Sequence, residues 1–195
     1  MNSNQRSVFR DQYNSPRLIS MSETAHVVQS RVAWAGLSDA VLISQCEVDT
    51  YRASGPGGQK KNKTSSAVRL RHAPSGLIVI AEESRSQHAN KAKAVVRLRQ
   101  AFYLHWRNEC RTGAKPTVGD GDRIDLRIKD PRFWPAVGVV LDVLTACAGR
   151  VSTAAERLGT TTANVVDFLQ IDPKVWQETN RIRAGFGLKG LKMGD

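Results

Sequence analysis

A glycine-rich segment flanked by two stretches of alternating apolar and polar residues constrains the fold more than any other feature of this sequence. Residues 46–53 (CEVDTYRA) alternate in this way and are rich in β-forming side chains, which predicts a strand. Residues 67–72 (AVRLRH) alternate again, and the turn-forming sequence APSG separates them from a second apolar stretch, LIVIAEE. We therefore expect a small β-sheet in which a β-hairpin follows the glycine-rich segment.

Two helices are predicted around this sheet. Residues 37–45 predict a short helix, for which Ser38 is a suitable N-cap. Between residues 87 and 110, apolar residues recur every three or four positions and basic residues occupy the positions between them. This pattern predicts a long helix that packs on the sheet and exposes a basic face. The residues expected to cap it and to shape the turn before it are Arg85, Ser86, Gln87 and Asn90.

The sequence after residue 136 predicts a separate set of short helices. One is expected over residues 137–148 and another where Thr153 and Glu156 have the spacing of a capping box. A third covers ANVVDFLQ, and a fourth begins at Pro173, a residue suited to the first position of a helix. Their short lengths and the glycine and threonines between them resemble a helix-turn-helix.

The predicted fold class is α+β: a small mixed β-sheet with a Gly-Gly-Gln loop and a long packed helix, followed by a small C-terminal helical bundle. Five segments are expected along the chain: a disordered N-terminal segment (1–33), the α+β domain (34–112), a linker interrupted by glycine and proline (113–135), the helical unit (136–185) and a short basic tail (186–195).

The positive charge is concentrated in one third of the chain. The formal net charge is +11, and residues 51–115 alone carry 14 basic and 3 acidic side chains. Residues 1–50 have a net charge of −1 and residues 116–195 a net charge of +1. Such a concentration beside a glycine-rich loop predicts a surface that binds a polyanion, above all a nucleic acid. No run of about 18 apolar residues is present, so no membrane-spanning helix is expected.

The loop itself is poorly suited to acid–base chemistry. Gly55, Gly57 and Gly58 allow positive φ angles and close approach to another molecule. Gln59 follows them and offers hydrogen-bond donors and an acceptor, but no group that transfers protons near neutral pH. The loop could therefore orient a water molecule and stabilise developing negative charge if a partner completed the site. A nucleotide-binding P-loop would need Lys and then Ser or Thr after the glycines, which this sequence lacks.

The loop and its surroundings resemble the catalytic domain of class I peptide chain release factors. The first block that carries this resemblance is Arg52, Ser54, Gly55, Gly57, Gly58, Gln59, Asn62, Thr64, Ser66, Ala67, Val68, Arg69, Leu70, His72, Pro74, Ser75 and Gly76. The second block is Arg85, Ser86, Gln87, Asn90, Lys93 and Ala94. Together they cover roughly residues 46–110.

The resemblance implies that the loop promotes attack of water on the ester between peptide and tRNA, in the peptidyl-transferase centre of the large ribosomal subunit. Gly57, Gly58 and Gln59 would be the catalytic residues, and no metal ion or small cofactor is implied. Residues that would contact ribosomal or transfer RNA are Arg52, Ser54, Lys60, Lys61, Asn62, Lys63, Thr64, Arg69, Arg71, Arg85 and Lys91. His72 is expected on the packed face of the hairpin, and Cys110 and Cys147 in the core rather than as reactive thiols.

The chain departs from release factors in ways that suggest a codon-independent hydrolase. Only about 50 residues precede the loop, so we expect no stop-codon-reading domain and favour the short peptidyl-tRNA hydrolases that rescue stalled ribosomes. The lysine- and arginine-rich tail of that group is weak here, so we expect the protein either to engage a split large subunit or to rely on a partner protein, with residues 136–185 as a packing module or a docking module for rRNA or protein. We expect a monomer without membrane contact, in the cytoplasm or alternatively an organelle matrix. The alternative function is a non-catalytic RNA-, ribosome- or DNA-binding regulator; the absence of Lys and Arg from TTANVVDFLQ argues against DNA.

Overall fold

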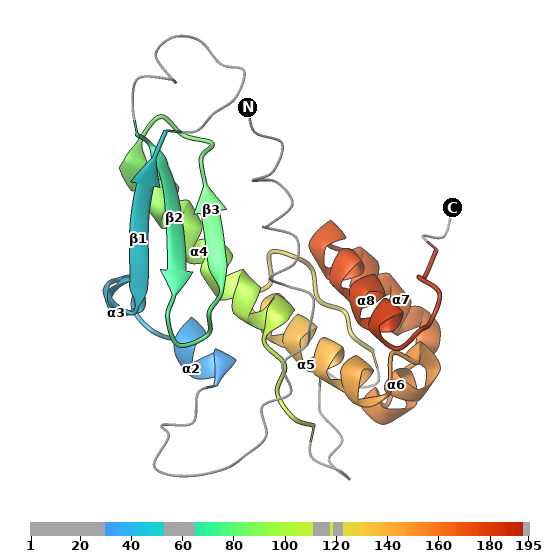
Figure 1. The fold of residues 1–195 in the computed structure, drawn as a ribbon. Coiled ribbons are helices and arrows are strands. Elements are labelled where there is room, and N and C mark those ends of the chain that lie inside the picture. Colours follow the sequence, from blue (N-terminus) through green and yellow to red (C-terminus); the bar gives the residue numbers. More distant parts are fainter. Residues whose placement is uncertain (1–29, 53–64, 111–117, 119–122, 193–195) are drawn as a thin grey trace, which may run out of the picture.

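The computed structural model describes residues 30–52, 65–110, 118 and 123–192. Its strands are β1 (Cys46–Tyr51), β2 (Ala67–His72) and β3 (Ile78–Ala81). Its helices are α2 (Arg31–Ala35), α3 (Asp39–Ser44), α4 (Gln87–His105), α5 (Phe133–Ala146), α6 (Val151–Leu158), α7 (Thr162–Gln170) and α8 (Pro173–Gly185). A small sheet with helices around it confirms the predicted α+β class (Figure 1).

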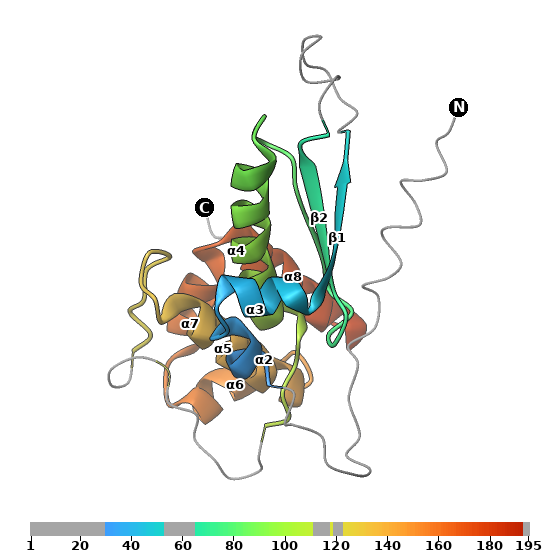
Figure 2. The same ribbon diagram turned by 90° about the vertical axis from the view of Figure 1, so that its left-hand side faces the viewer.

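The described strands form a sheet with the order β1-β2-β3, and both pairings are antiparallel. The predicted hairpin is β2–β3, and the register of β1 and β2 runs from Cys46 opposite His72 to Tyr51 opposite Ala67. The last pair is the point from which the glycine-rich loop departs. Helix α4 lies along one face of the sheet, as the two orthogonal views show (Figures 1 and 2).

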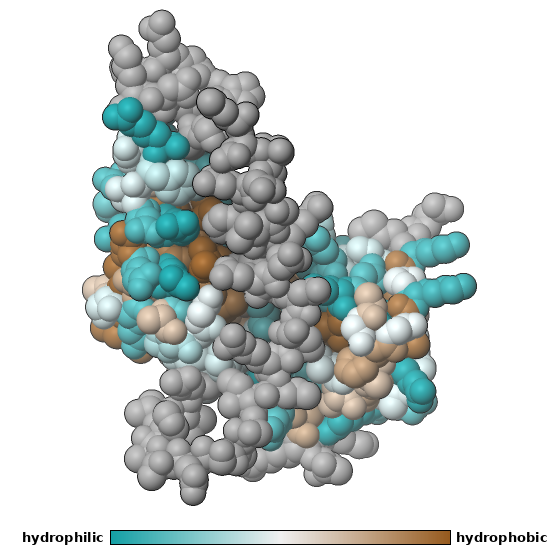
Figure 3. Space-filling view, viewed as in Figure 1, coloured by the Kyte–Doolittle hydropathy of each residue, from teal (hydrophilic) through white to brown (hydrophobic). Residues whose placement is uncertain are grey.

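The first hydrophobic core lies between the sheet and α4. Val68 and Leu70 of β2 are fully buried against Leu98 and Phe102 of α4. Burial of one side chain of this size stabilises a fold by about 1.5–3 kcal/mol, so the apolar stripe read from the sequence is the main reason that α4 docks here. The opposite face of the sheet is a mixture of hydrophilic side chains and smaller hydrophobic areas (Figure 3).

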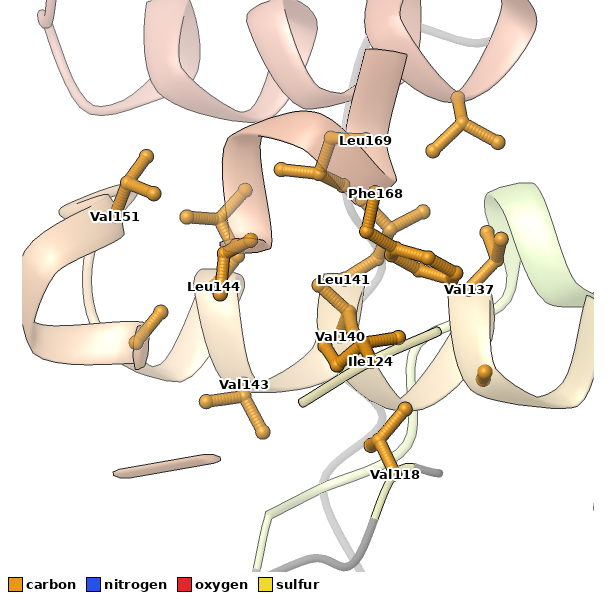
Figure 4. Packing of buried hydrophobic residues seen from close by; sticks show 14 of the residues in the cluster. Val118, Ile124, Val137, Val140, Leu141, Val143, Leu144, Val151, Phe168 and Leu169 are labelled. Carbon is orange, nitrogen blue, oxygen red and sulfur yellow. The ribbon is translucent and has the colours of Figure 1, made fainter. Parts of the chain in front are cut away.

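The second core lies among the helices α5 to α8. Leu141 and Leu144 of α5 pack against Phe168 and Leu169 of α7, and all four side chains are fully buried (Figure 4). The segment before α5, predicted to be a linker, contributes buried side chains to this core. Ile124 is buried there, and the Asn164 side chain of α7 binds its backbone on both sides, accepting from the Ile124 N–H at 2.8 Å.

Several element boundaries differ from the sequence prediction. Helix α2 includes residues 31–33, which were expected to be disordered, because Arg31 and Trp34 are buried by residues far away in the sequence. Helix α5 begins at Phe133, inside the predicted linker, and Leu126 of that segment is also buried.

The capping prediction for α6 was wrong, since the helix begins at Val151 and Arg150 occupies the N-cap position without a side-chain hydrogen bond. Gly159 does end α6, as expected, with a left-handed φ of 72°. Pro173 begins α8 as expected, and Asp172 caps it by accepting from the N–H of Lys174 at 2.7 Å.

Candidate functional site

The base of the glycine-rich loop is formed by the ends of β1 and β2. Arg52 follows β1 and is exposed, whereas Ser66 precedes β2 and is buried. The loop residues singled out from the sequence lie outside the described part of the chain: Ser54, Gly57, Gly58, Gln59, Lys60, Lys61, Asn62, Lys63 and Thr64. The structure therefore describes the scaffold of the candidate site, and the catalytic assignment stays a prediction.

Asn90 of α4 holds one side of this scaffold in place. Its fully buried side-chain amide donates to the carbonyl oxygens of Ser66 at 2.6 Å and Ser84 at 2.8 Å. Its Oδ1 accepts from the Ser84 N–H at 2.9 Å. Since these three bonds use both amide hydrogens and the oxygen, Asn90 ties the residue before β2 to the turn before α4.

The expectation that Asn90 shapes the turn before α4 is therefore confirmed, but Asn90 does not cap the helix. Ser86 alone of that group is the N-cap, and its hydroxyl accepts from the Ala89 N–H at 3.3 Å. Asn90 lies one turn before Ala94 and two turns before Leu98 on the buried face of the helix. A polar residue at a core position was the signal that could have revealed its role, because buried amides need partners.

Two of the proposed RNA-contacting arginines are paired with acidic residues across the sheet. Arg69 binds Asp49 at 2.5 Å and Arg71 lies 3.6 Å from Glu47, on the face opposite α4. These pairs are substantially exposed, so they add little to stability and can exchange partners with a phosphate. Because each arginine is paired with a carboxylate, this face of the sheet is less positively charged than the arginines alone suggested.

The other described candidates lie near the base of the loop without a carboxylate partner among the described residues. Arg85 is exposed in the turn before α4, and Lys91 is half-buried in the first turns of that helix. This end of α4 lies at the same end of the molecule as the end of β1 and the start of β2 (Figure 1). Arg52 at the end of β1 is also exposed, so three basic residues lie toward this end of the described structure, where Glu82 contacts Tyr51.

His72 is a structural residue, as expected. It is fully buried, and its ring packs edge-on against Trp34 and Phe102 at centroid distances of 5.1 and 4.9 Å. Burial lowers the pKa of His72 to about 4. Nε2 lies 3.1 Å from Oε1 of Gln45, which can only accept, and Nδ1 lies 2.8 Å from the Ser75 hydroxyl. The imidazole is therefore neutral near pH 7 and tied to the hairpin turn, where it cannot act on a substrate.

Comparisons with known proteins agree with this arrangement. Residues 40–124 match the sequence model of the family described as the RF-1 domain. Relatives named peptide chain release factor 1 occur in Novosphingobium aromaticivorans, 50% identical over 99 residues, and in Acetivibrio thermocellus, 49% identical over 90 residues. The relative from Syntrophobacter fumaroxidans is 42% identical over 120 residues.

These alignments cover 48%, 44% and 54% of this chain but only 27%, 25% and 34% of the respective relatives. The chain thus spans about a quarter to a third of their length. The similarity of residues 40–124 to the RF-1 domain, and of the chain to release factors, confirms the resemblance seen in the sequence. Helices α5 to α8 begin beyond the matched residues.

Proposed function

We propose that this protein hydrolyses the ester of peptidyl-tRNA on the ribosome without reading a stop codon. Water attacks the ester carbonyl carbon, the bond to the ribose oxygen of the tRNA breaks, and the products are a free peptide acid and a tRNA with its terminal hydroxyl restored. The observation that carries this proposal is the RF-1 match across the Gly-Gly-Gln loop, together with a strand pair and an Asn90 clamp that hold the loop's base.

Within this proposal the loop supplies positioning and hydrogen bonds rather than a base. Gly57 and Gly58 allow the backbone to approach the ester, and the N–H of Gln59 stabilises the oxyanion or the departing ribose oxygen. The Gln59 side chain places water. The nearest described histidine in sequence, His72, is buried and neutral, so the proton transfers fall to the tRNA and the ribosome.

The proposed partners are the RNA of the large ribosomal subunit and peptidyl-tRNA. Arg52, Arg85 and Lys91 would bind phosphates around the loop base, and Arg69 and Arg71 would do so after exchange from Asp49 and Glu47. Selection of a stalled particle would depend on the helical unit, directly or through a partner protein, and not on a codon. We propose that the protein acts as a monomer wherever its ribosomes are, in the cytoplasm or in an organelle matrix.

The described residues after α8 pack back against that helix. The guanidinium of Arg183 donates to the Lys189 carbonyl oxygen at 2.8 Å and to that of Gly149 at 2.6 Å. The Asn180 side chain accepts from the Leu191 N–H at 2.7 Å. Residues 186–191 are thus held along α8, and a basic side chain of this region is already occupied by internal contacts.

The test is release of labelled peptide from purified ribosomes that carry peptidyl-tRNA and lack a stop codon, with intact ribosomes and isolated large subunits in parallel. Gln59→Ala and Gly58→Ala are expected to abolish release, whereas Gln177→Ala, an exposed glutamine on α8, serves as the matched control and should retain it. Tight ribosome binding with no release on either particle would refute the hydrolase and leave the non-catalytic RNA-binding factor.

A further inference from the structure

Buried charges meet where α2 and the end of α4 contact the helical unit. The guanidinium of Arg31 in α2 binds both carboxylate oxygens of Asp142 in α5, at 2.8 and 2.6 Å. The side chains of Arg31 and Asp142 are only 4% and 6% exposed. Arg31 also donates to the carbonyl oxygen of Trp106 at 3.2 Å, directly after α4. One side chain therefore connects α2, the end of α4 and α5.

A second set of contacts extends this cluster to α8. Arg107 lies 3.7 Å from Asp142 and 3.4 Å from Glu178, and its side chain is 6% exposed. Glu178 also accepts from Arg181 and lies 3.3 Å from His105. Burial alone would raise the pKa of Glu178, but the hydrogen bonds from His105 and Arg181 and the charge of Arg107 outweigh it and lower that pKa to about 2. The carboxylate is therefore charged at every physiological pH.

Gly138 of α5 makes space for this arrangement. A Cβ atom at this position would lie 2.8 Å from Cζ and Nε of Arg31, closer than real atoms approach. Because Arg31 is buried and held by Asp142, it could move only by giving up those hydrogen bonds. A glycine inside a helix costs about 0.5–1 kcal/mol of stability relative to alanine. At position 138 this cost is offset because the missing side chain leaves space for the guanidinium of Arg31.

Charged contacts of this kind fix geometry more than they add stability. A buried ion pair gains little over an apolar contact of the same volume, but its hydrogen bonds are satisfied in only one relative orientation of the elements that carry them. Here the two carboxylates lie on α5 and α8 of the helical unit, whereas Arg31 and Arg107 come from α2 and from the segment after α4. Arg31, Arg107, Asp142 and Glu178 therefore form a joint between the helical unit and the elements that carry the loop base.

Helix α4 transmits any movement of the joint to the loop base. Asn90, which holds Ser66, and His105, which contacts Glu178, are separated by 15 residues of one helix. At a rise of 1.5 Å per residue this distance is about 22 Å. A tilt of about 10° at the joint would thus displace the loop base by about 4 Å, so that the helical unit and the loop base could no longer bind the particle at the same time.

We propose that the joint residues are positioning residues for peptide release: they lock the helical unit and the RF-1 domain into one body, so that docking of the helical unit on the ribosomal particle sets where the loop base lies. This inference rests on the proposed function. It assigns the helical unit the role of an orienting arm rather than of a binding module on a flexible tether.

The first experiment measures rigidity and does not depend on activity. Spin labels are attached through His88→Cys in α4 and Asp167→Cys in α7, both exposed positions, with Cys46, Cys110 and Cys147 replaced by alanine. A narrow distribution of label distances is expected, and Asp142→Ala should broaden it. Gly138→Ala is the milder second variant in case Asp142→Ala does not fold. Gly185→Ala is the matched control, because it is also a helical glycine but has open space around it.

The second experiment measures release kinetics of the full chain as a function of ribosomal particle concentration. If a loosened joint adopts the competent orientation about a tenth of the time, KM for the particle rises about tenfold while kcat at saturation stays within about threefold. Gly138→Ala should show this split and Gly185→Ala should not. A purely structural defect would instead reduce the active fraction, which lowers apparent kcat and leaves KM unchanged.

The proposal is overturned by folded joint variants that keep the narrow distance distribution, or by broadened distances with KM unchanged. A fall in kcat alone would also overturn it. If the unaltered protein releases no peptide, the proposed function fails, and co-sedimentation with large subunits then replaces KM. In that case a joint variant that binds the particle as tightly as the unaltered protein refutes the positioning role independently.

Discussion

Replacement of Asn90 by aspartate tests how the loop base is held. Asn90→Asp keeps the shape of the side chain and its acceptor for the Ser84 N–H, but it removes both N–H donors and turns a carboxylate oxygen toward the carbonyl oxygens of Ser66 and Ser84. Each lost hydrogen bond costs about 1 kcal/mol net, and a buried carbonyl left without a partner costs about 1–3 kcal/mol. We therefore expect a loss of about 3 kcal/mol.

Equilibrium unfolding in urea at pH 7 measures this loss. With an m-value of about 2 kcal/mol/M, the midpoint should fall by about 1.5 M. The deficit relative to the unaltered protein at the same pH should shrink when the new carboxyl group is protonated at low pH, because a donor is then restored. Asn180→Asp is the control: it lies in α8, keeps its acceptor for the Leu191 N–H and loses only a long hydrogen bond of 3.5 Å to the Leu191 carbonyl oxygen.

The same variants should separate stability from function. Under conditions where both are fully folded, Asn90→Asp should reduce peptide release by at least about tenfold, because the residue before β2 is no longer fixed. Asn180→Asp should retain release. A midpoint shift below about 0.3 M for Asn90→Asp, or equal release by the two folded variants, would refute the reasoning that Asn90 holds the loop base.

Further predictions concern two buried titratable residues and one helix end. His72 has a folded pKa of about 4, so its contribution to stability is complete above pH 6.5 and is lost as pH falls toward 4; His72→Phe should flatten that part of a pH–stability curve. The ionised Glu178 carboxylate contributes fully to stability above pH 4.5, and this contribution is lost as pH falls toward 2. Glu178→Gln should remove the pH dependence of stability in that range and destabilise the protein at pH 7 by about 3 kcal/mol. Gly159→Ala should cost about 1 kcal/mol in thermal unfolding, since its φ is 72°, whereas Gly185→Ala should be neutral or stabilising.

Local patterns predicted most of the elements and the family. Alternation placed β1 and β2 within two residues of their observed ends, and the three-to-four spacing of apolar residues placed α4. The Gly-Gly-Gln block and its flanking motif indicated the similarity to the RF-1 domain before any contact was known. These features depend on short-range backbone preferences and on side-chain periodicity, which are properties of neighbouring residues and can be read from a sequence.

Contacts between distant residues decided the rest. Arg31 belongs to a segment expected to be disordered, and its ion pair with Asp142, 111 positions away, together with the burial of Trp34, explains why α2 forms. Asn90 was expected to cap α4 and shape the turn before it, and its further bond to Ser66, 24 positions earlier, could not be read from local spacing. The sequence alone determined which chemistry the loop could offer and which elements would flank it. The tertiary structure decided what holds the loop's base and how the helical unit is joined to it, because buried polar groups take partners from wherever the fold brings them, regardless of distance along the chain.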